Sequence, residues 1–173
     1  CCAGTIVIPR GTEVTSTVQT ILTGLGLTEV AVNAMPRVLV LTSGHEVIEP
    51  GESLTAGKIY NSNRAMICGL LEDLGFHKIT HYHVSDAPEE LESEINHVLQ
   101  LSEDADIIIS SGGVSVGLFD TMPLIYEKLG AKSIYARIQM RPGAASYGAV
   151  TPKGQIIFGL SGNPGAAFNG WHL

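Results

Sequence analysis

The sequence predicts a three-layer α/β/α domain with a mostly parallel sheet and one β-hairpin, preceded by a small module. From residue 37 onward, short continuous apolar runs alternate with segments of helical periodicity, as in a sheet whose strands are covered on both faces. Near the end, two β-prone runs joined by Thr151-Pro-Lys-Gly154 are typical of a hairpin. The alternating pattern is absent before Pro36. We therefore expect a partial β-rich module over 1–36, the end of a preceding domain, and the α/β domain over 37–173.

In the first module, we expect a strand and turn over 4–11 and a second strand over 29–32. Between them, a short helix over 14–24 is predicted, capped by Thr15 or Ser16, because hydroxyl side chains accept from the free N–H groups of a first turn.

The elements of the larger domain follow in order. A buried strand over 37–43 precedes a helix from Asn61-Ser62 to about Leu74, where Gly75 ends it. Pro88 is predicted at the first turn of the next helix, since proline lacks the N–H that a first turn leaves unpaired. The remaining elements are strands over 78–84 and 105–110, a helix from Asp120 to Gly130, a hairpin over 146–150 and 155–160, and a helix from Pro164.

Composition excludes several classes of partner. The net charge is −7, so the chain lacks the basic footprint of a nucleic-acid-binding protein. Its apolar runs are shorter than the roughly 20 residues that cross a bilayer, and we expect no membrane partner.

Three cysteines give no disulfide framework, which favours a cytoplasmic location. The chain begins without Met and stops at Trp171-His-Leu173, as a helix starts, so we interpret it as a fragment of something longer.

Ligands of open parallel sheets bind beyond the carboxyl ends of the strands. In this chain four segments should therefore share one rim of the sheet: Ser43-Gly44, Asp86, 110–120 and 161–164.

The segment Gly113-Val-Ser-Val-Gly117 admits two functional interpretations. It satisfies the G-x-S-x-G pattern of serine hydrolases, but that mechanism also needs an acid and a histidine later in the chain, and the only later histidine is His172. Alternatively, the loop is an anion cradle, in which glycines permit positive φ and N–H groups converge. The cradle would use Gly112, Gly113 and Gly117, with Ser110, Ser111 and Ser115 as hydroxyl donors. A plain strand-to-helix connection capped by Asp120 is equally compatible with the spacing.

A second loop, Gly159-Leu-Ser-Gly-Asn-Pro164, runs from the hairpin into a helix. Its Ser161, Gly162 and Asn163 would lie at a helix N-terminus, a natural anion site, although an ordinary turn also fits.

Three carboxylates follow strands on the same rim: Glu46, Asp86 and Asp120. Mg²⁺ takes one or two carboxylates plus ligand oxygens, so these side chains are candidate metal ligands. His81 and His83 share a strand face, but they lack an obvious third ligand and are better explained as partly buried strand histidines.

These residues resemble a known family. The ordered motifs are Thr42-Ser-Gly-His-Glu46, Gly57-Lys-Ile-Tyr-Asn-Ser-Asn-Arg64, Val84-Ser-Asp-Ala-Pro88, Ser110-Ser-Gly-Gly-Val-Ser-Val-Gly117 with Asp120, Arg141-Pro-Gly143 and Gly159-Leu-Ser-Gly-Asn-Pro164. They resemble the molybdopterin-binding domain of molybdopterin molybdenumtransferases, which are related to the gephyrin E domain, over residues 37–173.

The resemblance implies insertion of molybdenum from molybdate into molybdopterin, with the adenylylated pterin as substrate and Mg²⁺ as helper. The cradle and Ser43-Gly44 would hold the pterin or its phosphate. Glu46, Asp86 and Asp120 would be the acidic set for cleavage of the adenylate, and Arg141 and Pro142 would border molybdate. Family members are generally homodimers.

Two positions depart from the family pattern. His45 stands where an acid is usual, and Ala144 replaces a usual lysine. A module that carries or senses molybdopterin without inserting metal is therefore an alternative function.

Overall fold

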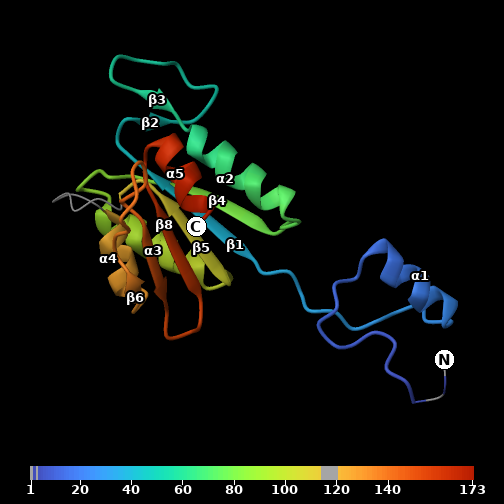
Figure 1. Cartoon of the computed structure of the whole chain (residues 1–173). Helices are drawn as coiled ribbons and strands as arrows, with labels where there is room; N and C mark the ends of the chain where they lie inside the picture. The colour runs from blue at the N-terminus through green and yellow to red at the C-terminus, as the bar shows by residue number, and fades with distance from the viewer. Residues whose placement is uncertain (1, 3, 114–120) are drawn as a thin grey trace. The chain divides into compact units, whose positions relative to one another are not determined.

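The computed structural model describes residues 2, 4–113 and 121–173, and the chain divides into two compact units, Cys1–Ala34 and Met35–Leu173 (Figure 1).

The first unit contains helix α1, Ser16–Gly24. Thr15 caps this helix as predicted, its hydroxyl accepting from the backbone N–H of Val18 at 3.4 Å. The strands predicted within 4–11 and over 29–32 are wrong, because residues 2 and 4–34 include no strand, although a turn is present at residues 10–11. A strand is stabilised by a paired neighbour and by burial of one face. None of these described residues is buried, so neither contribution is present.

The second unit is built on a six-stranded sheet in the order β4-β1-β5-β8-β7-β6. The first four strands run parallel, and β7 and β6 each pair antiparallel with their neighbour. The strands are β1 Val38–Ser43, β4 Ile79–Val84, β5 Ile107–Ser111, β6 Lys132–Tyr135, β7 Tyr147–Val150 and β8 Ile156–Leu160. The predicted parallel core and the β7–β8 hairpin are both confirmed.

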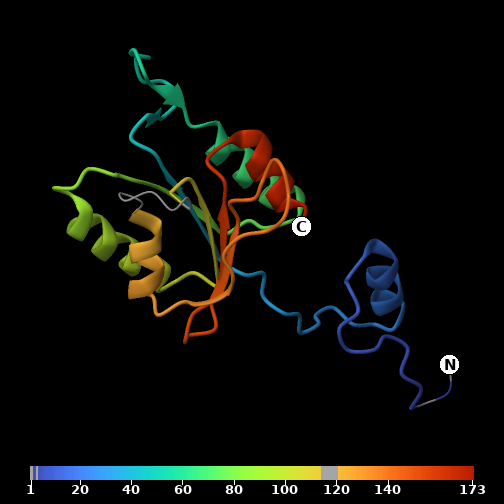
Figure 2. The same ribbon diagram turned by 60° about the vertical axis from the view of Figure 1, so that its left-hand side comes forward.

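Helices cover both faces of this sheet, which makes the predicted three layers (Figure 2). Alternate residues of β1 serve the two sides: Leu39 and Leu41 pack with α3 and α4, and Val38 and Val40 pack with α2 and α5. Because side chains alternate across a strand, a strand between two helix layers is apolar along nearly all of the stretch that the helices cover, here Val38–Leu41 of β1. The helices are α2 Ser62–Asp73, α3 Leu91–Ser102, α4 Thr121–Lys128 and α5 Pro164–Trp171.

Three details differ from the sequence prediction. Helix α3 begins at Leu91, because Pro88 and the next two residues form a turn closed by a bond from the N–H of Glu90 to the carbonyl of Ala87. Edge strand β6 was not predicted, since its residues are mostly exposed and form no apolar run. The two-residue strands β2, Val47–Ile48, and β3, Ile59–Tyr60, are too short to leave a pattern.

Strands β2 and β3 pair in parallel and form a small extension over residues 47–60, which we call the arm. In Figures 1 and 2 the arm projects from the body of the domain next to α2. It leaves the carboxyl end of β1 and returns to the start of α2, which places it at the predicted rim.

Candidate functional site

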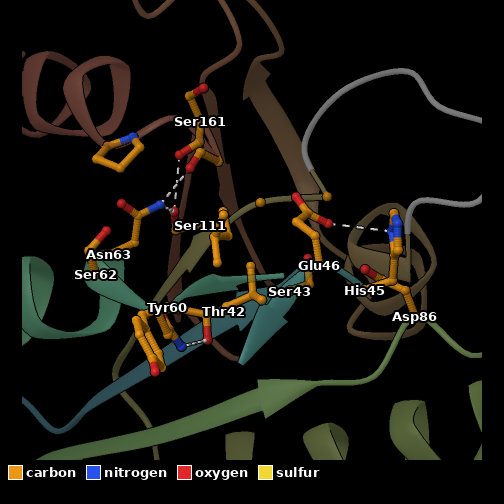
Figure 3. Close-up of a pocket in the computed structure, with 18 of the residues that line it drawn as sticks. Thr42, Ser43, His45, Glu46, Tyr60, Ser62, Asn63, Asp86, Ser111 and Ser161 are labelled. Carbon is orange, nitrogen blue, oxygen red and sulfur yellow. Dashed lines mark hydrogen bonds and ion pairs between the residues drawn. The ribbon is translucent and has the colours of Figure 1, made fainter. Parts of the chain in front are cut away.

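A cavity of about 390 Å³ lies at the carboxyl ends of the parallel strands (Figure 3). Its wall is contributed by the segments that follow β1, β4, β5 and β8, by the arm and by the first turn of α2. The lining residues are Thr42, Ser43, Gly44, His45, Glu46, Val47, Ile59, Tyr60, Asn61, Ser62, Asn63, Asp86, Ser111, Gly112, Gly113, Ala145, Ser161, Gly162 and Pro164. The described residues of the predicted rim, except Ser110 and Asn163, therefore line one pocket.

Two glycines bring the end of β5 against the end of β1. Gly112 and Gly113 have φ values of +89° and +60°, which L side chains rarely adopt. A Cβ at Gly112 would overlap the backbone carbonyl oxygen of Ser43, and one at Gly113 would lie 2.8 Å from the Ser43 hydroxyl. The glycines therefore allow a close backbone approach that a side chain would prevent.

The two glycine-containing loops touch each other. A Cβ at Gly162 would lie 3.4 Å from the Cα of Gly112, so the loops after β8 and β5 are in direct contact. Gly112 of the predicted cradle and Gly162 of the predicted second anion loop are thus neighbours in the cavity wall.

Asn63 joins these loops to helix α2, a role that the sequence analysis missed. Its side-chain Nδ2 donates to the Ser111 hydroxyl and to the Gly162 carbonyl, each at 2.8 Å, and the Ser111 hydroxyl donates to the carbonyl of Ser161 at 3.0 Å (Figure 3). The available signal was the polar run Asn61-Ser-Asn63 at a helix start, since first-turn side chains lie beside the strand ends.

Two buried polar atoms at this wall lack partners among the described residues: the Ser43 hydroxyl and the Asn63 Oδ1. Leaving a buried polar atom unsatisfied costs about 1–3 kcal/mol, so such atoms are uncommon in folded proteins. Their position at the cavity wall is typical of a binding site rather than of a packed core.

Glu46 and Asp86 line the cavity on the side opposite Ser62 and Asn63 (Figure 3). Glu46 Oε2 lies 3.4 Å from His45 Nδ1, and Asp86 Oδ1 accepts from the Thr121 hydroxyl at 3.1 Å. Asp120, the third predicted carboxylate, lies outside the described residues, as do Ser115 and Gly117. Among the residues that are described, no three His, Cys, Asp or Glu side chains form a metal-binding cluster.

Ser110 does not line the cavity, contrary to the prediction. It is fully buried on the opposite face of the sheet and hydrogen-bonds the hydroxyl of Tyr126 in α4. Ser110 and Ser111 are consecutive residues of β5, so they must point to opposite faces, and only Ser111 can reach the cavity.

The structure also places three further predicted residues. Asn163 caps α5, its Oδ1 accepting from the N–H of Ala166 at 3.1 Å. Arg141 lines a separate hollow with Arg137, and a cis peptide bond joins it to the exposed Pro142. The same segment ends at Ala145, which does line the cavity.

A polar network is centred on Thr42, which lines the cavity, and joins β1 to β4 and to the start of α2. Its hydroxyl accepts from Asn61 Nδ2 at 2.9 Å and lies 3.0 Å from His81 Nε2 and 3.1 Å from His83 Nδ1. A hydroxyl offers one donor and two acceptor positions, so one histidine must accept and the other must donate. Burial, aided by the positive charge of Arg64, lowers the pKa of His81 to about 4. The histidines are therefore structural partners of Thr42, as partly buried strand histidines would be.

His172, the histidine that a Ser115 hydrolase would require, forms the C-terminal cap of α5, with its ring edge-on to Phe168 at 4.6 Å between centroids. Within the described residues, no helix is long and apolar enough to span a bilayer.

The sequence is similar to curated proteins throughout its length. A molybdopterin molybdenumtransferase of Staphylococcus epidermidis is 37% identical over 175 residues, covering 99% of this chain. One from Staphylococcus aureus is 38% identical over 170 residues, covering 98%. The chain spans about 40% of the length of either relative.

Solved structures show the same architecture. The molybdopterin biosynthesis MoeA protein of Pyrococcus horikoshii superposes with a TM-score of 0.70 at 27% identity, covering 90% of this chain and 37% of that chain. The molybdopterin biosynthesis Mog protein of Mycobacterium ulcerans gives 0.56 at 18% identity, covering 81% and 91%, which supports the fold alone.

The family model described as "Probable molybdopterin binding domain" matches residues 39–173, a range that contains every residue of the cavity wall. This chain therefore belongs to the molybdopterin-binding domain family.

Proposed function

We propose that this chain is the pterin-binding part of a molybdopterin molybdenumtransferase, and that its cavity holds molybdopterin in its adenylylated form. Molybdate would be the second substrate and Mg²⁺ a helper ion. The observation that carries the proposal is the meeting of two glycine-containing loops, two unpartnered buried polar atoms and two carboxylates in one cavity.

Backbone dipoles make the cavity suitable for a phosphate in spite of the acidic sequence. The first turns of α2 and α5 contribute Ser62, Asn63 and Pro164 to the wall. The N-terminus of a helix carries unpaired N–H groups and a partial positive charge, which attract anions. Pro164 has no N–H, so α5 acts here through its dipole alone. Bonds from Asn63 to Ser111 and Gly162 hold the loops in place before a ligand arrives, and such preorganisation reduces the entropic cost of binding.

The carboxylates at the cavity fit a magnesium ion. Glu46 and Asp86 would supply oxygen ligands, and Asp120 remains a predicted third ligand. When bound, Mg²⁺ would offset negative charge on the phosphate during cleavage of the adenylate. Glu46 is partly exposed to solvent, so it can bind an ion without first breaking a buried contact.

Each group of residues at the cavity has a separate proposed role. Gly112, Gly113 and Gly162 let the loops approach the phosphate closely, Glu46 and Asp86 place the ion, and the wall of the cavity limits access of water to the adenylate. Arg141 would attract molybdate, since it and Arg137 line the neighbouring hollow, and their segment reaches the cavity at Ala145.

Binding and turnover can be tested separately. Isothermal titration with molybdopterin should show binding to this chain, and Mg²⁺ should tighten binding of the adenylylated form. Glu46→Gln with Asp86→Asn should remove the Mg²⁺ effect while leaving binding of molybdopterin itself within about twofold. If the wild-type chain binds no pterin, the proposal fails.

The insertion step requires the full-length protein, because the chain spans only part of its relatives. Full-length protein should restore molybdoenzyme activity in a bacterial strain that lacks its own molybdenumtransferase. Arg141→Gln should raise the molybdate concentration needed for rescue by about tenfold, the value of one charge-assisted hydrogen bond. Lys128→Gln, a change on α4 away from both hollows, is the matched control.

A carrier or sensor of molybdopterin is the second candidate, favoured by Ala144 and by His45, whose side chain is 88% exposed beside Glu46. Tight pterin binding without molybdate-dependent turnover would identify this function. We also propose a cytoplasmic homodimer for the full-length protein, by analogy with the family. A serine hydrolase remains a remote alternative, and labelling of Ser115 by a fluorophosphonate probe would support it.

A further inference from the structure

Glu49 lies in the arm just after β2, and it is absent from the cavity wall. Its carboxylate nevertheless makes two short hydrogen bonds to helix α2. Oε1 accepts from Asn61 Nδ2 at 2.7 Å, and Oε2 accepts from the Arg64 guanidinium at 2.6 Å. The side chain is 28% exposed, so solvent screens this ion pair less than a fully exposed one. Burial opposes ionisation of Glu49, but the bonds from Asn61 and Arg64 together outweigh it and lower its pKa.

Asn61, one of the two partners of Glu49, holds together several parts of the site. Asn61 is 3% exposed and caps α2, its Oδ1 accepting from the N–H of Arg64 at 3.1 Å. The same side chain donates to Thr42 at the end of β1. Directly after this cap come Ser62 and Asn63, which line the cavity. Asn61 therefore connects Glu49 to the first turn of α2.

Among the described residues the arm has few other hydrogen bonds to the domain, one of them from the Val47 N–H to the Gly44 carbonyl at 2.9 Å. The backbone N–H groups of Ile59 and Asn61 donate to the carbonyls of Glu46 and Ile48, each at 2.8 Å, and these bonds join the two sides of the arm to each other. Lys58 hydrogen-bonds the carbonyl of His45. The arm nevertheless supplies Val47, Ile59 and Tyr60 to the cavity wall, so its position determines the shape of the site.

We propose that Glu49 is a positioning residue, which fixes the arm and the first turn of α2 against each other and so sets the shape of the pterin cavity. Glu49 does not touch the ligand. The inference relies on the proposed function for the identity of that ligand, whereas the effect on the arm is independent of it.

Amide hydrogen exchange of the ligand-free chain tests the structural half. In Glu49→Gln an NH2 group replaces one of the two oxygens that accept from Asn61 and Arg64, so one bond of the observed geometry is lost, and Glu49→Leu loses both. The amides of Ile59 and Asn61 should exchange about tenfold faster in Glu49→Leu and by a smaller factor in Glu49→Gln. Amides of β1 and β5 should keep their wild-type rates. Unchanged exchange in the arm, or equal acceleration in the central strands, would overturn the proposal.

Titration with molybdopterin tests the functional half. Glu49→Leu should raise the Kd about tenfold, and saturating ligand should restore slow exchange at Ile59 and Asn61. The matched control is Glu103→Gln, which removes an equally short ion pair with Lys153 at 2.6 Å, where both side chains are more than half exposed. It should change neither Kd nor exchange in the arm. If the wild-type chain fails to bind molybdopterin, the proposed function is wrong. If it binds and Glu49→Leu leaves the Kd unchanged, only the positioning role is refuted.

Discussion

Replacement of Gly112 by alanine tests the close approach of β5 and β1 at the cavity. The residue has a φ of +89°, and the left-handed region costs an L-residue about 1–2 kcal/mol. The new Cβ would also overlap the carbonyl oxygen of Ser43, a backbone atom that cannot rotate away. Overpacking of this kind costs about 1–3 kcal/mol, so Gly112→Ala should lose about 2–5 kcal/mol of unfolding free energy.

Gly154 provides the matched control, because it has nearly the same φ of +84° and no heavy atom within 4 Å of the position that a Cβ would take. Gly154→Ala should lose only about 1 kcal/mol, since the conformational cost is partly offset by the lower entropy of its unfolded chain. Urea denaturation measures both variants, and titration with molybdopterin measures the site. Gly112→Ala should also weaken binding by at least tenfold, whereas Gly154→Ala should bind as the wild type does. Equal stability and equal binding of the two variants would refute the close approach.

Three further predictions concern side chains. Tyr126→Phe leaves the buried Ser110 hydroxyl without its partner and should cost about 1–3 kcal/mol in urea denaturation, and adding Ser110→Ala should recover part of this loss. The second prediction concerns His81. Its pKa is lowered in the folded protein, so the folded protein binds a proton at His81 more weakly than the unfolded chain does. Its contribution to stability is thus full above pH 6.5 and lost as pH falls toward about 4, and denaturation of His81→Gln should lack this component. Asn63→Ala should weaken molybdopterin binding about tenfold, while Asn96→Ala on α3 should not; equal effects would contradict the role of Asn63.

The sequence by itself determined the parallel core, because that information is local. Every position from Val38 to Ser43 is buried between helix layers, and such a strand must be apolar almost throughout. The helix starts after Asn61 and at Pro164 were also predictable, since a capping side chain bonds backbone only three residues away and proline suits a first helical turn. The location of the rim could be predicted from the direction of the strands alone, because parallel strands end at one edge of the sheet. Glu46, Asp86 and Gly162 accordingly line one cavity.

Tertiary structure decided what depends on contacts between distant residues. Either Ser110 or Ser111 could have faced the cavity until the sheet and its helix layers fixed which side of β5 each one occupies. Asn63 acquired its role from bonds to residues 48 and 99 positions away, and the arm from a pairing of two-residue strands. Local propensity carries no information about such partners, because their energy exists only when separate segments meet.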